Sequence, residues 1–118
     1  MTIRDISEIL SAEIICGEEK LEKEVYNAFG SDMMSDVLAF VKDQSLLITG
    51  LCNPQVIRTA EMMDISCVCF VRGKTPETAM VELARERGIV LMTTEIRMFT
   101  ACGVLYEKGL RGGADQCL

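Results

Sequence analysis

The chain has 118 residues, 49 % of them apolar, and a formal net charge of −6, which suits one domain with its own core. The negative charge argues against nucleic-acid binding, because phosphate contacts need clustered lysine and arginine. No apolar run approaches the roughly 20 residues of a membrane span and no signal peptide is evident, so we expect a cytoplasmic protein.

The first thirty residues predict a helix followed by two short strands. Thr2 is expected to cap the helix, and strands are expected over residues 13–16 and 24–29, separated by a polar turn. The apolar residues of the helix recur at the spacing of one buried face. They are Ile3, Ile6, Ile9 and Leu10.

A second helix is predicted over residues 33–41, with Ser31 or Asp32 as its N-cap. Apolar residues cover more than half of its circumference, so we expect one side to touch the sheet and another side to touch something else. These residues are Met33, Met34, Val37, Leu38, Phe40 and Val41.

Residues 46–94 alternate between apolar runs and helical patterns. The helices, over residues 53–63 and 76–87, each begin with a capping residue followed by proline, at Asn53 and at Thr75. Near-continuous apolar strands that alternate with helices indicate parallel strands covered on both faces. The runs that predict these strands are residues 46–49, 66–71 and 89–92.

A last helix is predicted over residues 95–108, after which residues 111–118 are expected to form a flexible tail. The whole pattern therefore predicts an α/β fold, a three-layer sandwich with a mostly parallel sheet of about five strands, in one domain over residues 1–110. Because apolar residues are abundant and aromatic residues make up only 5 %, we expect surplus apolar surface to be buried in a homodimer.

The six cysteines do not predict a metal site or a disulfide framework. They are scattered, no C-x₂-C pair occurs, and the chain contains no histidine. Cys67 and Cys69 lie two apart on a predicted buried strand, so both are expected to face the same side as small apolar core residues. We therefore predict no metal and no cofactor.

Candidate ligand-binding residues lie where the predicted parallel strands end. In such sheets, ligands bind beyond the carboxyl ends of the strands, where helix N-termini point free N–H groups at them. Small, hydroxyl and cationic residues there suit an anionic or nucleotide-like ligand, although the same residues are also the caps and turns that any such fold needs. The candidates are Thr49, Asn53, Arg72, Lys74, Thr75, Thr93 and Thr94, together with Ser31 and Asp32.

Two possible catalytic motifs are weak. The sequence at residues 73–75 resembles the end of a phosphate-binding P-loop, but the glycine required five residues earlier is replaced by Val68. Asp32 and Asp36 are spaced to bind a divalent cation or to act as an acid/base pair, but aspartate at a helix start also serves as a cap. With no histidine and no nucleophile motif, no enzyme is predicted.

Many core positions of the chain resemble the DRTGG domain. The matching segments are residues 6–10, 12–19, 31–37, 46–49, 66–73, 88–94 and 99–105, together with Leu21 and Val25. The chain is most similar to short stand-alone members related to the N-terminal domain of HPr kinase/phosphorylase, some of which are associated with iron-only hydrogenase gene clusters. The resemblance implies a three-layer fold like the N-terminal domains of HPr kinase and Mur ligases. It also implies a non-catalytic regulatory or dimerising role.

The name motif of that family is not preserved here. Residues 51–53 stand in place of its Asp-Arg pair, and residues 71–74 in place of its Thr-Gly-Gly stretch. Two main hypotheses follow. The chain is a homodimeric regulatory domain that senses an anionic ligand, or it is an interaction subunit of a redox or hydrogenase-associated complex that docks through residues 33–41.

Overall fold

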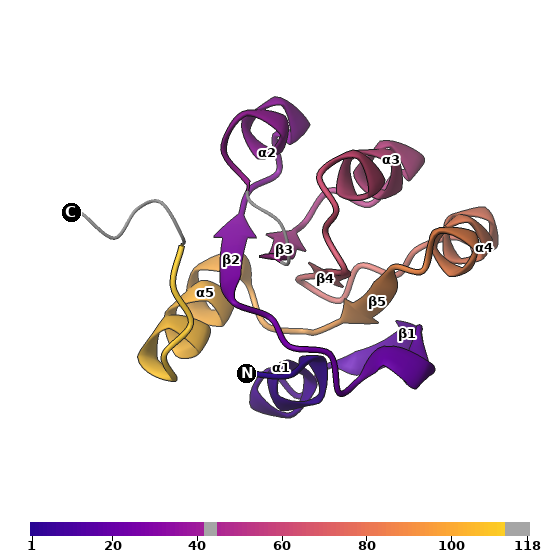
Figure 1. Ribbon diagram of the computed structural model, residues 1–118. Helices are drawn as coiled ribbons and strands as arrows, with labels where there is room; N and C mark the ends of the chain where they lie inside the picture. Colours follow the sequence, from indigo (N-terminus) through magenta and orange to yellow (C-terminus); the bar gives the residue numbers. More distant parts are fainter. Residues whose placement is uncertain (42–44, 113–118) are drawn as a thin grey trace.

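A five-stranded sheet lies between two layers of helices (Figure 1) in the computed structural model, which describes residues 1–41 and 45–112. The strand order is β1-β5-β4-β3-β2. Strands β2 to β5 run parallel, and β1 pairs antiparallel with β5. This confirms the predicted mostly parallel sheet. The strands are β1 (Glu13–Cys16), β2 (Asn27–Gly30), β3 (Ser45–Thr49), β4 (Cys67–Phe70) and β5 (Val90–Thr93).

The helices are divided between the two faces of the sheet. Helices α2, α3 and α4 lie on one face, and α1 and α5 lie on the other (Figure 1). Connections between parallel strands need such crossovers, which is why the helices alternate with the strands along the chain. Their bounds are α1 (Ile3–Ile9), α2 (Met34–Phe40), α3 (Pro54–Met62), α4 (Thr78–Arg87) and α5 (Met98–Glu107), and a short 3₁₀ turn spans Glu18–Lys20.

The core consists of two apolar clusters, one on each face of the sheet. Successive residues of a strand point to opposite faces, so Leu47 belongs to the cluster beneath α2–α4, whereas Leu46 belongs to the cluster beneath α1 and α5. Cys67 and Cys69 are fully buried in this second cluster, as predicted for core thiols. Among the described residues, no three metal-ligating side chains come together.

Three element boundaries differ from the sequence prediction by two residues or more. The second strand begins at Asn27 rather than at residue 24, because Val25 donates its backbone N–H to Met1 and pairs with the N-terminal segment. Helix α4 begins at Thr78 rather than at residue 76, since Pro76 is buried in an extended loop. Helix α5 begins at Met98, three residues later than predicted.

The C-terminal end of the described chain lies against the edge strand β2. The backbone N–H of Ala28 donates to the carbonyl of Arg111 at 2.9 Å, and the Arg111 guanidinium stacks 4.0 Å from the centre of the Tyr106 ring. The rest of the predicted tail, residues 113–118, lies outside the described residues. Within the described part of the chain, no helix combines the length and the apolar character needed to cross a bilayer.

Candidate functional site

The loops that follow the four parallel strands meet at one edge of the sheet, here called the carboxyl edge. They are residues 31–33 after β2, 50–53 after β3, 71–77 after β4 and 94–97 after β5. Parallel pairing in register brings these loops side by side in the order in which their strands pair. All nine candidate residues from the sequence lie on or directly before these loops.

Asp32 joins the loop after β2 to the end of β3. Its Oδ1 atom accepts hydrogen bonds from the backbone N–H of Gly50 at 2.7 Å and from the hydroxyl of Thr49 at 3.2 Å. The Thr49 hydroxyl, which is buried, in turn accepts from the N–H of Leu51 at 3.1 Å. The Asp32 carboxylate is therefore directed at the neighbouring strand end rather than at the helix that follows it.

The loop after β4 opens with a tight turn formed by residues 71–74. The N–H of Lys74 donates to the carbonyl of Val71 at 3.3 Å, and Arg72 and Gly73 have φ angles of 61° and 69°. Two successive positive φ angles define a type I′ turn, in which the first position favours asparagine, aspartate or glycine. An arginine there is strained. The turn is held by hydrogen bonds to the next loop, from the N–H of Arg72 to Ile96 and from that of Gly73 to Thr94.

Two charged side chains lie directly on glycine backbone at this edge. A Cβ atom added to Gly50 would collide with the Arg72 guanidinium, whose Cζ would be 3.2 Å away. A Cβ added to Gly73 would lie 2.8 Å from the Glu95 carboxylate. Each loop therefore contacts the next one. Asp32 and Arg72 both contact Gly50, and Glu95 contacts Gly73. A side chain at Gly50 would displace the Arg72 guanidinium, whereas Gly73 also favours glycine because of its φ of 69°.

Two cations in the loop after β4 are available to a ligand, and a third exposed cation of the edge, Arg97, lies in the loop after β5. Arg72 and Lys74 are exposed, and neither forms a salt bridge with another described residue. The carbonyl of Lys74 accepts from the Thr93 hydroxyl at 2.6 Å, which holds the backbone but leaves the ammonium group free to move. Burial raises the pKa of the Cys52 thiol, and the positive charge of Lys74 partly opposes that shift.

Most hydroxyl candidates hold loops in place instead of facing solvent. Thr94 is only 3 % exposed, and its hydroxyl donates to the carbonyl of Leu10 at 2.7 Å and accepts from the N–H of Ile96. Thr75 donates to the carbonyl of Gly73 at 3.5 Å. Both threonines thus shape the edge. Its exposed charged residues are Arg72, Lys74 and Arg97, together with Asp32, Glu77 and Glu95.

The predicted helix caps are right for α1 and α3 and wrong for α2 and α4, and Thr2 forms the expected capping box with Asp5. Asn53 caps α3 as expected, accepting from the N–H of Gln55 at 3.0 Å. Ser31 instead accepts from the N–H of Met33 within its own loop, and Asp32 bonds to β3 as described above. Thr75 lies three residues before α4, whose N-cap is Glu77. The N-caps of α2 and α4 form no side-chain hydrogen bond to their helices.

Gly50 and Glu95 belong to the edge but were not among the predicted binding residues. A glycine immediately after a strand is a signal for close approach of another group, so Gly50 was detectable in principle. The position of Glu95 depends on the hydrogen bonds between two loops and has no local signal.

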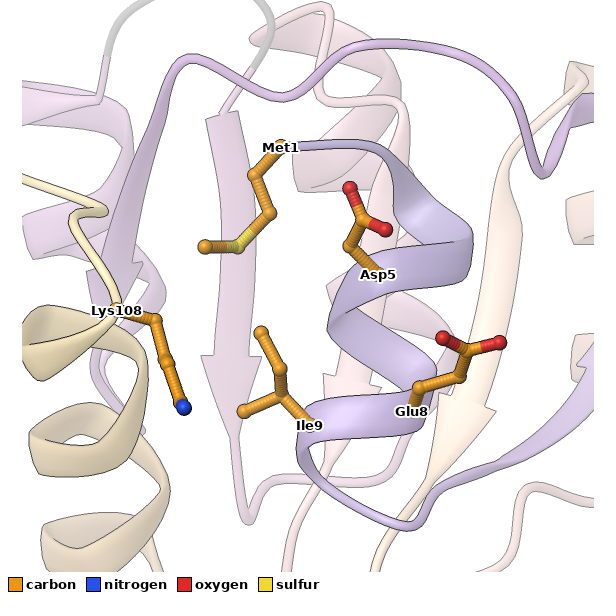
Figure 2. A pocket seen from close by; sticks show the side chains of 5 residues that line it. All are labelled: Met1, Asp5, Glu8, Ile9 and Lys108. Atoms are coloured by element: carbon orange, nitrogen blue, oxygen red, sulfur yellow. The ribbon is translucent and has the colours of Figure 1, made fainter.

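A separate open hollow lies on the outer surface between α1 and α5 (Figure 2), with a volume of about 410 Å³. The Lys108 side chain extends from the end of α5 toward Ile9, with the carboxylates of Asp5 and Glu8 on the α1 side. Asp5 completes the capping box of α1 with Thr2, which lowers the pKa of its carboxyl group. The hollow is therefore lined in part by Asp5, which already takes part in capping α1. It is lined by Met1, Asp5, Glu8, Ile9 and Lys108.

Comparisons with known proteins agree with this architecture. A crystal structure of the CBS and DRTGG domains of the regulatory region of Clostridium perfringens pyrophosphatase, complexed with the activator diadenosine tetraphosphate, is similar with a TM-score of 0.72 and 23 % identity. The similarity covers 88 % of this chain but only 45 % of that chain, and at this identity it shows the fold alone. No curated protein matches. Residues 5–107 match the DRTGG domain family, and the chain therefore belongs to that family.

Proposed function

We propose that this chain is a non-catalytic regulatory domain, homodimeric, that binds an anionic, nucleotide-like ligand at the carboxyl edge. The observation that carries the proposal is the position of Arg72. Its guanidinium lies over the backbone of Gly50, exposed and without a salt bridge to any other described residue. Guanidinium groups are the preferred partners of phosphate, which they bind through two parallel hydrogen bonds.

The strained backbone of Arg72 supports a functional role. Residues held at positive φ without glycine cluster at ligand-binding and switch sites, where the surrounding structure maintains them. Two hydrogen bonds to the loop after β5 maintain this turn. A ligand that draws the Arg72 side chain away from Gly50 would change the contact between the loops after β3 and β4. Ligand binding at Arg72 would thereby change how the loops of the carboxyl edge contact each other.

The ligand class is supported by the relative as well as by the charges. The similar structure is a regulatory region in complex with a nucleotide activator, and that region contains a DRTGG domain. Lys74 supplies a second cation next to Arg72, as a polyphosphate requires. Asp32, one member of the possible acid/base pair, is committed to hydrogen bonds within the fold, which supports a binding role over a catalytic one.

Calorimetric titration tests the site. Diadenosine tetraphosphate, ATP, ADP and pyrophosphate are titrated into the wild-type chain and into Arg72→Gly, Lys74→Ala and Arg58→Ala. Arg72→Gly removes the guanidinium and also relieves the positive φ, so the fold is expected to stay intact. At least one ligand should bind the wild type, with affinity falling about 10- to 100-fold in Arg72→Gly.

Arg58 is the matched control, because it is an exposed arginine within α3 and away from the carboxyl edge. Its replacement should leave affinity unchanged. The site is refuted if no ligand of the panel binds, or if Arg72→Gly binds as tightly as the wild type.

The alternative function is an interaction subunit of a redox or hydrogenase-associated complex. Exposed apolar residues on and next to α2 favour it, namely Met33, Leu38 and Phe40. Affinity purification with the wild type and with Phe40→Ser separates the two functions. A stoichiometric protein partner that is lost in Phe40→Ser supports the alternative, whereas nucleotide binding that depends on Arg72 supports the proposed function.

A further inference from the structure

Helix α5 carries an apolar stripe that is largely exposed, although the Arg111 guanidinium stacks on one of its rings, that of Tyr106. Phe99 is 91 % exposed and Tyr106 is 58 % exposed, although both belong to a helix whose other side, with Ala101 and Leu105, is buried against the sheet. At about 100° per residue, Phe99, Gly103 and Tyr106 lie within about 60° of each other on the outer side. A helix that is apolar on every side is usually covered on every side.

Gly103 has no explanation within a single copy of the chain. It lies in the interior of α5, where glycine is unfavourable relative to alanine. No atom lies within 4 Å of the position that its Cβ would occupy, so the space is open. Between the two exposed aromatic rings, the missing side chain forms a notch into which a second helix can approach closely.

We infer that α5 is the homodimer interface, with α5 of a second copy packed antiparallel across Gly103. This inference rests on the homodimer included in the proposed function and specifies its surface. A twofold axis through Gly103 makes the contact self-complementary, because the aromatic rings beside the notch of each copy pack against the α5 helix of the other copy.

The charges on this face suit a second copy. The face includes an anion, Glu107, as well as cations, so a twofold contact can place opposite charges of the two copies against each other. In an antiparallel pair centred on Gly103, Arg97 of one copy lies within about 3 Å, along the helix axis, of the level of Glu107 in the other. The charged residues of this face are Arg97, Glu107, Lys108 and Arg111.

The aromatic area is also of the right order. Aromatic side chains bury about 150–250 Å² each, and Phe99 and Tyr106 are 91 % and 58 % exposed, so the four rings of two copies supply about 450–750 Å². The smallest stable interfaces bury about 1,200 Å², so the proposed contact also requires the other exposed residues of α5, such as Thr100 and Glu107. By contrast, the exposed apolar residues of α2 do not form one face, because Leu38 and Phe40 point about 160° apart around their helix.

Sedimentation equilibrium from 1 to 200 µM tests the interface with Gly103→Lys and Phe99→Ser. Gly103→Lys fills the notch with a charged chain in open space, so it should not impair folding, and circular dichroism and thermal unfolding check this. Both variants should weaken dimerisation at least tenfold. The matched controls are Gln55→Lys, which adds the same charge on α3, and Phe40→Ser, which removes an exposed aromatic residue from α2. Both should dimerise like the wild type.

Cross-linking provides a direct measure of proximity. Under mild oxidation, Gly103→Cys should form a covalent dimer because the two thiols lie near the axis, whereas Glu86→Cys on α4 should not. A wild-type dimer that tolerates Gly103→Lys overturns the α5 interface but leaves the homodimer standing. A wild type that is monomeric at 200 µM overturns both. Neither result affects nucleotide binding at Arg72, which calorimetry measures independently.

Discussion

The Asp32 carboxylate accepts a hydrogen bond from the backbone N–H of Gly50 at 2.7 Å, which ties the end of β2 to the end of β3. Arg72 approaches the same glycine from the β4 side, and Glu95 covers Gly73 from the β5 side. The loops of the carboxyl edge are thus connected by exposed charged groups on backbone instead of by apolar packing. Such contacts are individually weak, and a charged ligand can replace them.

Loss of the Asp32 carboxylate should destabilise the chain. Asp32→Ala removes two hydrogen bonds to a charged acceptor, and we expect the free energy of unfolding to fall by about 1–3 kcal/mol in urea titrations. Asp36→Ala is the control. Asp36 lies in the first turn of α2 and forms no side-chain hydrogen bond with a described residue, so its loss should cost only about 0.3–1 kcal/mol. Equal losses would contradict the proposed link between β2 and β3.

Replacement of two glycines by alanine should have opposite effects. Gly73→Ala forces a side chain onto a φ of 69° and against the Glu95 carboxylate, so it should destabilise by about 1–2 kcal/mol. Gly103→Ala adds a methyl group to an open helix position and should stabilise the monomer by up to about 1 kcal/mol. Thermal unfolding at low protein concentration measures both. A stabilising Gly73→Ala would show that the turn does not require positive φ.

The buried Thr94 hydroxyl should be important for the attachment of α1. Thr94→Val keeps the shape but leaves the carbonyl of Leu10 without its donor, which should cost about 1–3 kcal/mol. Hydrogen exchange should then be faster in α1 than in α4. Thr100→Val on the exposed side of α5 is the control, and it should change neither stability nor exchange. Unchanged exchange in α1 of Thr94→Val would argue against this attachment.

Buried thiols should make the fold sensitive to alkaline pH. Burial raises the pKa of the Cys69 thiol from 9.0 to about 12, and it also raises the pKa of Cys67 well above its ordinary value. Between pH 9 and 12 the unfolded chain releases these protons more readily, so stability is fully present below pH 9 and falls as the pH rises. Cys69 alone should contribute a slope of about 1.4 kcal/mol per pH unit.

Urea unfolding from pH 7 to 11 measures this slope. Cys69→Ala should lose the Cys69 contribution, even though the smaller side chain lowers stability at every pH. The comparison is therefore between slopes and not between absolute stabilities. Identical slopes in the wild type and in Cys69→Ala would mean that the Cys69 thiol already ionises near its ordinary pKa in the folded state.

Local patterns were sufficient to predict the elements that form the sheet. The apolar runs at residues 46–49, 66–71 and 89–92 became β3, β4 and β5, and the Asn53–Pro54 start of α3 is confirmed. The same reasoning was wrong for Asp32 and Thr75, which were expected to cap helices. A short polar residue near a helix start has the same local signal whether it bonds to that helix or to another strand.

Apolar periodicity and turn residues therefore determined the order and type of the elements, because both depend on residues that are close in the chain. Only the tertiary structure decided that Asp32 and Arg72 converge on Gly50, and that Phe99 points away from the sheet. These contacts join loops that are about twenty or more residues apart, and they exist because parallel pairing brings the strand ends to one edge. Which side of α5 is covered depends likewise on its neighbours in space, since the helix itself is apolar on nearly every side.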